Sequence, residues 1–212
     1  MSTTENAPAP APAAATAAAT PVADPAALGL AAFALTTFLL SAANAGWMTA
    51  ATGSAWLGYA FAYGGLVQLL AGMWEFRNRN VFGCTAFGSY GGFWIGLGIW
   101  AIRVAPHAAS AAAADHDVGW ILLAWAIFNT YMLFWSTAVN GAVFAVFLTL
   151  EATEVILFIG NFAASSGVVK LGGYIGVLTA LVAWYTSSAV VINTMKGRQV
   201  VPVGKAFGPL AA

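Results

Sequence analysis

The sequence predicts an all-α protein, a polytopic integral membrane bundle of six transmembrane helices. Hydrophobic residues make up 61% of the chain and charged residues only 7%, whereas soluble globular domains carry roughly a quarter charged residues. Six mostly apolar stretches also reach the length of about 20 residues that a helix needs to cross a hydrocarbon core. Water is therefore not the main solvent of this chain.

The chain divides into three regions by composition. Residues 1–23 are rich in Ala, Pro and Thr and lack apolar surface, which is typical of a disordered tail. Residues 24–195 form the six-helix transmembrane domain. Residues 196–212 are expected to be a cytoplasmic C-terminal tail.

The order of the apolar stretches and the basic residues predicts the orientation. Five of the seven basic residues fall on one side if the spans alternate, so the positive-inside rule places both termini on the cytoplasmic side. The membrane is expected to be the cell (plasma or inner) membrane. These five are Arg77, Arg79, Lys196, Arg198 and Lys205, with Arg103 and Lys170 opposite. The predicted spans are residues 28–46, 57–74, 82–101, 118–139, 141–162 and 171–192.

Two features near the second and third spans have structural interpretations. Gly88, Gly92 and Gly96 recur every four residues and form a bare stripe along which another helix can pack closely.

Glu75 follows the second span beside Arg77 and Arg79, which favours an ion pair at the cytoplasmic mouth.

Polar side chains inside the first span share one helix face. Phe33, Thr37, Ser41 and Asn44 lie within roughly 80° of one another at about 100° per residue. Polar groups in hydrocarbon need partners or line water. The alternative is that Thr37 and Ser41 bond to carbonyls of their own helix.

The fifth span carries two carboxyl groups near the bilayer midplane. Leu150, Glu154 and Asn161 share one face, and Glu151 lies about 100° away. An ionised carboxylate is costly at that depth, so Glu154 and Glu151 are candidates for proton coupling. The alternative is a structural carboxyl hydrogen-bonded across a helix or subunit interface.

Several helices present bulky or polar groups at one depth. At 1.5 Å per residue, Phe33, Gln68, Tyr90, Thr130 and Leu150 lie roughly 8 to 16 Å above the cytoplasmic boundary. A narrow pore needs this combination of apolar bulk to exclude hydrated ions and a few hydrogen-bonding groups for a polar permeant.

Cofactor and enzyme chemistry are not predicted. His107 and His116 fall in a predicted loop, so no intramembrane histidine pair is available for haem. Lys170 lies at a span boundary, so no lysine is placed at the midplane to form a Schiff base with a retinal-type chromophore. Asp115, His116 and Asp117 could bind a metal, but the Ala run beside them indicates a solvated loop. Balanced charge also argues against nucleic-acid binding.

Short runs in consistent order resemble the acetate uptake transporters, the succinate–acetate permease family. Residues 24–37 read DPAALGLAAFALTT, where that family usually has NPAPLGL, then Phe and paired threonines, here Thr36 and Thr37. The other matching runs are Tyr63-Gly64-Gly65 with Gln68, Ala71-Gly72 with Glu75, Phe82-Gly83, Thr85-Ala86-Phe87, Ser89-Tyr90-Gly91-Gly92-Phe93-Trp94 and Ile159-Gly160-Asn161.

The resemblance implies a pore through each protomer and assembly as a homo-hexamer among membrane lipids. It carries the family's constriction to Phe33, Tyr90 and Leu150. Asp24 and Ala27 depart from the usual motif, and Glu151 and Glu154 depart from the more apolar residues that the family has at those positions.

The function expected from this resemblance is transport of acetate and other short carboxylates, succinate included, coupled to protons. The substrate pathway is predicted to use hydroxyl and amide groups, namely Thr36, Thr37, Asn44, Gln68, Thr130 and Asn161. Two alternatives remain open. They are a passive channel for small neutral solutes such as urea or amides, and a membrane scaffold or sensor that transports nothing.

Overall fold

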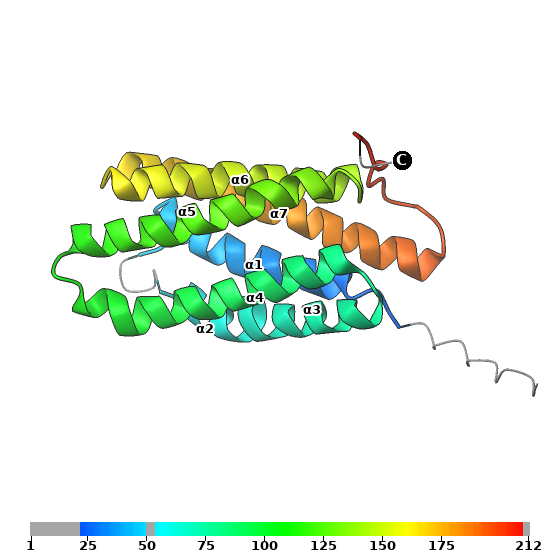
Figure 1. Cartoon of the computed structure of the whole chain (residues 1–212), viewed down its shortest axis with the longest axis horizontal. Helices are drawn as coiled ribbons and strands as arrows, with labels where there is room; N and C mark the ends of the chain where they lie inside the picture. Colours follow the sequence, from blue (N-terminus) through cyan, green and yellow to red (C-terminus); the bar gives the residue numbers. More distant parts are fainter. Residues whose placement is uncertain (1–21, 50–53, 210–212) are drawn as a thin grey trace, which may run out of the picture.

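The computed structural model describes residues 22–49 and 54–209, and every regular element in these ranges is helical. The helices lie side by side in one elongated bundle, with both ends of the described chain at the same end (Figure 1). In chain order they are α1 Ala26–Asn44, α2 Trp56–Phe61, η1 Ala62–Val67, α3 Gln68–Arg77, α4 Val81–Ile99, η2 Trp100–Val104, η3 Ala105–His107, α5 Ala111–Ser136, α6 Gly141–Phe162 and α7 Ser166–Lys196.

Four of these helices, α1, α5, α6 and α7, are long and apolar enough to cross a membrane. The second predicted span corresponds to an interrupted helical run, and the third corresponds to α4. A π-helical segment, η1, separates α2 from α3, and another, η2, follows α4. In η1, a Cβ on Gly65 would collide with the carbonyl oxygen of Ala60, so this wider turn depends on glycine.

Small residues allow the helices to approach closely. α1 packs against α7 and α3, α6 packs between α5 and α7, and α3 packs on α4. A Cβ on Gly173 of α7 would lie 2.8 Å from the Ser41 carbonyl oxygen, and one on Gly72 of α3 would lie 2.5 Å from the Gly88 nitrogen. Close backbone contact of this kind is typical of membrane helix pairs.

The predicted glycine stripe packs differently from expectation. Gly92 and Gly96 are exposed, and a Cβ on either would meet no atom of the described chain within 4 Å. Gly91, one position away, faces Leu69 of α3 instead. The sequence shows the glycine repeat but not how α4 is rotated about its axis. The aromatic side chains of α4 point into the bundle, and the exposed glycines lie on the opposite side of the helix.

The alanine run predicted as a loop is helical, which corrects that expectation. α5 begins at Ala111, and the Ser110 hydroxyl accepts a hydrogen bond from the Ala113 nitrogen at 3.1 Å. Serine is a favoured N-cap and alanine the best helix former. Asp115 and His116 therefore lie on the first turns of α5.

The chain after α7 folds back along the bundle. Gly197 has φ of 60° and ends α7, and the Asn193 side chain then bonds the backbone of Val200 and Val201. The Ala142 nitrogen donates to the Val203 carbonyl at 2.8 Å. The start of α6 is thereby tied to the C-terminal segment.

Candidate functional site

Three cavities follow one another between the helices. The Glu75 cavity has a volume of about 80 Å³ and is lined by Gln68, Glu75 and Asn80, among others. The Glu154 cavity, of about 40 Å³, is lined by Thr37, Asn44 and Glu154. The Asp115 cavity, of about 440 Å³, shares Asn44 with it and also includes Asp115 and Asn161. The largest of the three cavities therefore lies at one end of the series, and the smallest lies in the middle.

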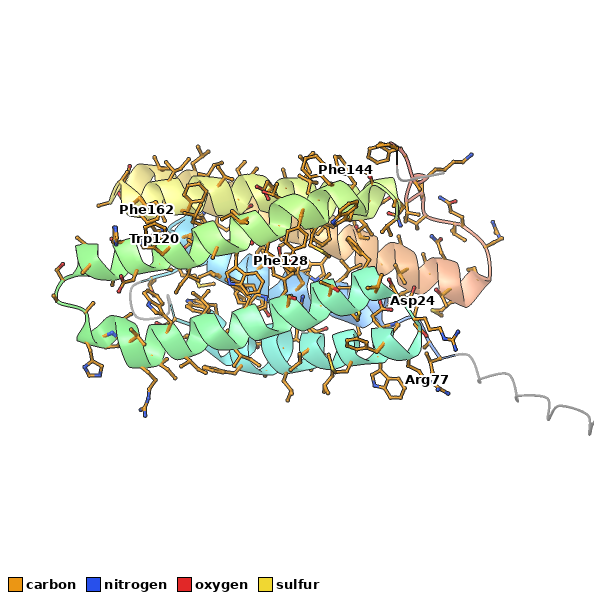
Figure 2. All side chains as sticks on the ribbon, viewed as in Figure 1. Asp24, Arg77, Trp120, Phe128, Phe144 and Phe162 are labelled. Atoms are coloured by element: carbon orange, nitrogen blue, oxygen red, sulfur yellow. The ribbon has the colours of Figure 1, made fainter. Side chains whose placement is uncertain are left out.

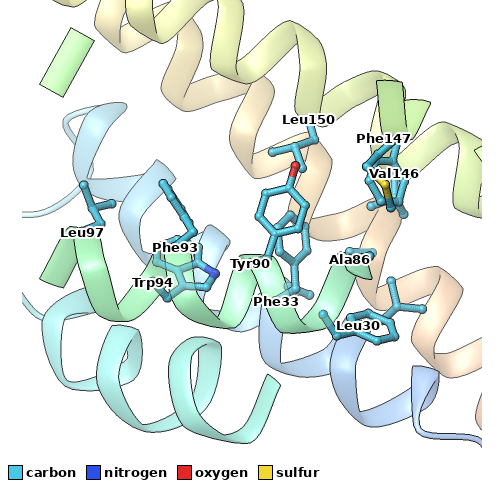
Figure 3. Close-up of a cluster of buried hydrophobic side chains, with 14 of the residues drawn as sticks. Leu30, Phe33, Ala86, Tyr90, Phe93, Trp94, Leu97, Val146, Phe147 and Leu150 are labelled. Carbon is cyan, nitrogen blue, oxygen red and sulfur yellow. The ribbon is translucent and has the colours of Figure 1, made fainter. Parts of the chain in front are cut away.

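The predicted constriction lies between the two small cavities. Phe33, Tyr90 and Leu150 each line both of them. All three are at most 6% exposed, and the Phe33 and Tyr90 ring centroids are 5.7 Å apart in an edge-on arrangement. Figure 3 shows the three side chains gathered together. Helices α1, α4 and α6 therefore each supply one bulky side chain to the layer between these two cavities.

Aromatic rings hold Tyr90 in place between α4 and α5. Its ring centroid lies 5.4 Å from that of Trp125 and 5.5 Å from that of Phe128. Phe93 and Phe147 pack beside it at 6.3 and 6.5 Å. Edge-to-face contacts at these distances are favourable.

Buried polar atoms without partners mark the walls of the two small cavities. Within the described residues, five buried side chains have an oxygen or nitrogen that makes no hydrogen bond: Thr37 Oγ1, Gln68 Oε1, Glu75 Oε1, Trp94 Nε1 and Glu154 Oε2. All five side chains line the Glu75 or the Glu154 cavity. Because buried polar groups are almost always paired, their concentration here indicates a path for water or a polar permeant.

Glu75 does not form the expected ion pair. Its Oε2 accepts a hydrogen bond from Asn80 Nδ2 at 3.0 Å, and a Cβ on Gly83 would lie 2.5 Å from its Oε1. Arg77 and Arg79 are exposed, and Figure 2 shows Arg77 at the end of the bundle near Asp24. The carboxyl group turns into the cavity because the glycine beside it leaves room.

Of the other residues predicted to line the pathway, Asn161 lines a cavity and the two threonines do not. Asn161 lines the Asp115 cavity, and its Nδ2 donates to the Leu157 carbonyl at 2.8 Å. Thr36 is fully buried against Gly64 of η1. Thr130 is exposed on α5. Neither threonine lines any of the three cavities described above.

Glu151 and Glu154 have separate environments although they are three residues apart. Glu154 is 3% exposed and lines the cavity named after it. Glu151 is half-buried between α5 and α6, where its Oε2 accepts a hydrogen bond from Asn129 and its Oε1 lies 2.8 Å from the Thr130 hydroxyl oxygen. Only Glu154 lines one of the three cavities.

Asn129 is the residue that the sequence interpretation missed. It is fully buried, and its Oδ1 accepts a hydrogen bond from the Tyr90 hydroxyl at 2.9 Å. The available signal was an amide inside the fourth predicted span, next to Thr130, which was chosen instead.

Comparison with known proteins finds relatives whose names describe transporters. It is 39% identical over 195 residues to acetate permease A of Emericella nidulans, covering 85% of this chain but 65% of that protein. It is 35% identical over 184 residues to the succinate-acetate/proton symporter SatP of Escherichia coli, covering 86% and 96% of the two chains. This chain therefore spans less than two thirds of the Emericella protein.

The fold matches a solved structure. The structure of the bacterial acetate channel SatP superposes with a TM-score of 0.79 at 33% identity, covering 87% of this chain and 100% of that one. The sequence model of the GPR1/FUN34/yaaH family also matches residues 7–205 of this chain. With the constriction and its flanking cavities, these matches establish that the chain belongs to the GPR1/FUN34/yaaH family.

Proposed function

We propose that this protein conducts acetate and other short carboxylates, succinate included, across a cell membrane, accompanied by protons, through a pore within each protomer. The observation that carries the proposal is the set of unpartnered polar atoms on either side of the Phe33, Tyr90 and Leu150 constriction. They offer hydrogen bonds to a small polar permeant in an otherwise apolar path. The names of the Emericella and Escherichia relatives support acetate as the permeant.

The permeant passes the constriction as a weakly held species. The residues that line the two small cavities include no Lys or Arg, so no opposite charge holds a carboxylate there. Thr37, Asn44, Gln68 and Asn161 supply hydrogen bonds along the path, and Glu154 exchanges a proton beside it.

Around this pore we propose six membrane crossings, with α2, η1 and α3 forming the second and α4 with η2 the third. Both termini then lie in the cytoplasm, and protomers assemble as a homo-hexamer. The resemblance to the acetate uptake transporters supports the hexamer.

Flux through the purified protein tests the proposal. Radiolabelled acetate is added to proteoliposomes with and without an imposed pH gradient, and protein-free liposomes are subtracted because undissociated acetic acid crosses lipid. We expect protein-dependent uptake that the gradient increases. Conduction of urea or acetamide without acetate would identify a neutral-solute channel, and no flux of any solute would favour a scaffold or sensor.

A further inference from the structure

A chain of hydrogen bonds runs from Tyr90 at the constriction, through Asn129, to Glu151 between α5 and α6. The Tyr90 hydroxyl donates to Asn129 Oδ1 at 2.9 Å. Asn129 Nδ2 donates to Glu151 Oε2 at 2.7 Å and to the Phe147 carbonyl at 3.0 Å. Thr130 Oγ1 lies 2.8 Å from the second Glu151 oxygen and 2.8 Å from the Ala126 carbonyl oxygen, and its single hydrogen can be donated to only one of them. Every polar atom of the Asn129 side chain therefore has a partner.

These partners fix the direction of the Asn129 amide. A backbone carbonyl and a carboxylate both accept hydrogen bonds, so the nitrogen of Asn129 must face Phe147 and Glu151. Its oxygen must then face Tyr90. A reversed amide would leave two acceptors opposite an oxygen in a fully buried site, which is costly.

The amide direction in turn fixes the Tyr90 hydroxyl. A tyrosine hydroxyl has one hydrogen to donate and can also accept, and the hydrogen is already directed at Asn129 Oδ1. What the hydroxyl can offer to the constriction is a lone pair. A neutral carboxylic acid can donate its O–H to that lone pair, whereas a carboxylate has no hydrogen to donate.

We propose that Asn129, anchored by Glu151, is a positioning residue that makes Tyr90 a hydrogen-bond acceptor and thereby selects the undissociated acid over its anion. This inference rests on the proposed transport of short carboxylates. It gives Glu151 a structural task and leaves proton exchange to Glu154. The titratable side chains around Tyr90 are Glu154, Glu151 and Tyr131, and none of them is a cation that would attract the anion.

The test measures protein-dependent acetate flux in proteoliposomes at mildly acidic and mildly alkaline pH and compares the ratio of the two between variants. Asn129→Leu frees the Tyr90 hydrogen, so the anion gains a donor at the constriction. The acidic-to-alkaline ratio should fall about three- to tenfold, the effect of one net hydrogen bond. A lower flux at both pH values with an unchanged ratio would reduce Asn129 to a structural role and overturn the proposal.

Tyr90→Phe, alone and combined with Asn129→Leu, completes a double-mutant cycle. If Asn129 acts through the hydroxyl, Asn129→Leu should change the ratio in the wild-type background but not in the Tyr90→Phe background. Equal effects in both backgrounds would show that Asn129 acts by another route and would contradict the proposal.

Substitutions at Glu151 keep the proposal testable if Asn129→Leu does not fold. Glu151→Gln retains an oxygen that accepts from Asn129, so the ratio should stay at the wild-type value. Glu151→Leu removes one of the two acceptors and leaves the Phe147 carbonyl, so it should lower the ratio, but by less than Asn129→Leu does. The reverse pattern would overturn the anchoring role. Wild-type protein without flux above liposomes would instead refute the transport function itself, so the two failures are distinguishable.

Discussion

At the scale of single residues, buried polar groups of the pathway differ from those that stabilise the bundle. Thr153 on α6 and Thr179 on α7 pair with each other at 3.0 Å, and the Ser187 hydroxyl donates to the Ala27 carbonyl at 2.7 Å. Thr37 and Glu154 each retain an unpartnered oxygen. The first group holds helices together, and the second group is available to a permeant.

Leu150 should limit the size of the permeant. Leu150→Ala removes three carbons from the narrowest layer, so the ratio of butyrate to acetate flux should rise about tenfold, the usual discrimination by a methylene-sized change in an apolar site. The measurement is competitive uptake in proteoliposomes. Leu148→Ala is the matched control, because Leu148 lies on the same helix and is 48% exposed. An equal change in both variants would argue against Leu150 as the selective side chain.

Glu154 should couple acetate to protons. Glu154→Gln keeps the shape of the side chain but carries no exchangeable acid proton, so the initial rate of gradient-driven acetate uptake should fall, whereas the final accumulation, which the pH gradient alone sets for an undissociated acid, should not change. Intravesicular acetate and pH are followed together. Glu151→Gln is the comparison, since Glu151 is bonded between α5 and α6. A slower initial uptake in Glu151→Gln with a wild-type rate in Glu154→Gln would reverse the assignment.

At the scale of elements, sequence patterns predicted where helices lie better than how they are rotated. Each predicted span overlaps a helical run of the structure, but η1, η2 and η3 were not predicted, and neither was the helical start of α5 at Ala111. Thr130 was chosen over Asn129 because both are polar and at nearly the same depth. The rotation that buries Asn129 follows from the packing of Trp125 and Phe128 on Tyr90.

The α1–α7 contact should depend on Gly173. Gly173→Ala places a Cβ against the backbone of Asn44 and Ala45, which cannot shift cheaply, so the free energy of unfolding should fall by about 1–3 kcal/mol. Gly167 lies on the same helix, and a Cβ there meets nothing within 4 Å. Gly167→Ala should change stability by less than about 1 kcal/mol. Thermal unfolding in detergent compares the two, and equal midpoints would contradict the predicted role of the contact.

At the scale of the whole molecule, the proposed path lies where separate helices meet. Phe33, Tyr90 and Leu150 come from α1, α4 and α6, and the described chain starts and finishes at one end of the bundle (Figure 1). This placement of the ends is compatible with an even number of crossings.

The proposed six crossings can be tested by labelling. Cys84 is the only cysteine, so a Cys84→Ser background permits single cysteines at Asn78 and Ala109, which are both exposed. With six crossings, an impermeant maleimide applied outside intact cells should label Ala109→Cys at once and Asn78→Cys only after permeabilisation. Labelling of Asn78→Cys from outside would mean that the run from α2 to α4 does not cross the membrane as proposed.

The sequence by itself determined that the protein is helical, that its helices suit a membrane, and which family motifs it carries, because hydrophobic length and local motifs are properties of neighbouring residues. Only the tertiary structure decided that Glu75 turns into a cavity, that Glu151 bonds Asn129, and that Tyr90 donates its hydrogen away from the path. These outcomes depend on the rotation and contact of helices distant in the chain. Rotation is set by side-chain packing between helices, which no single segment encodes.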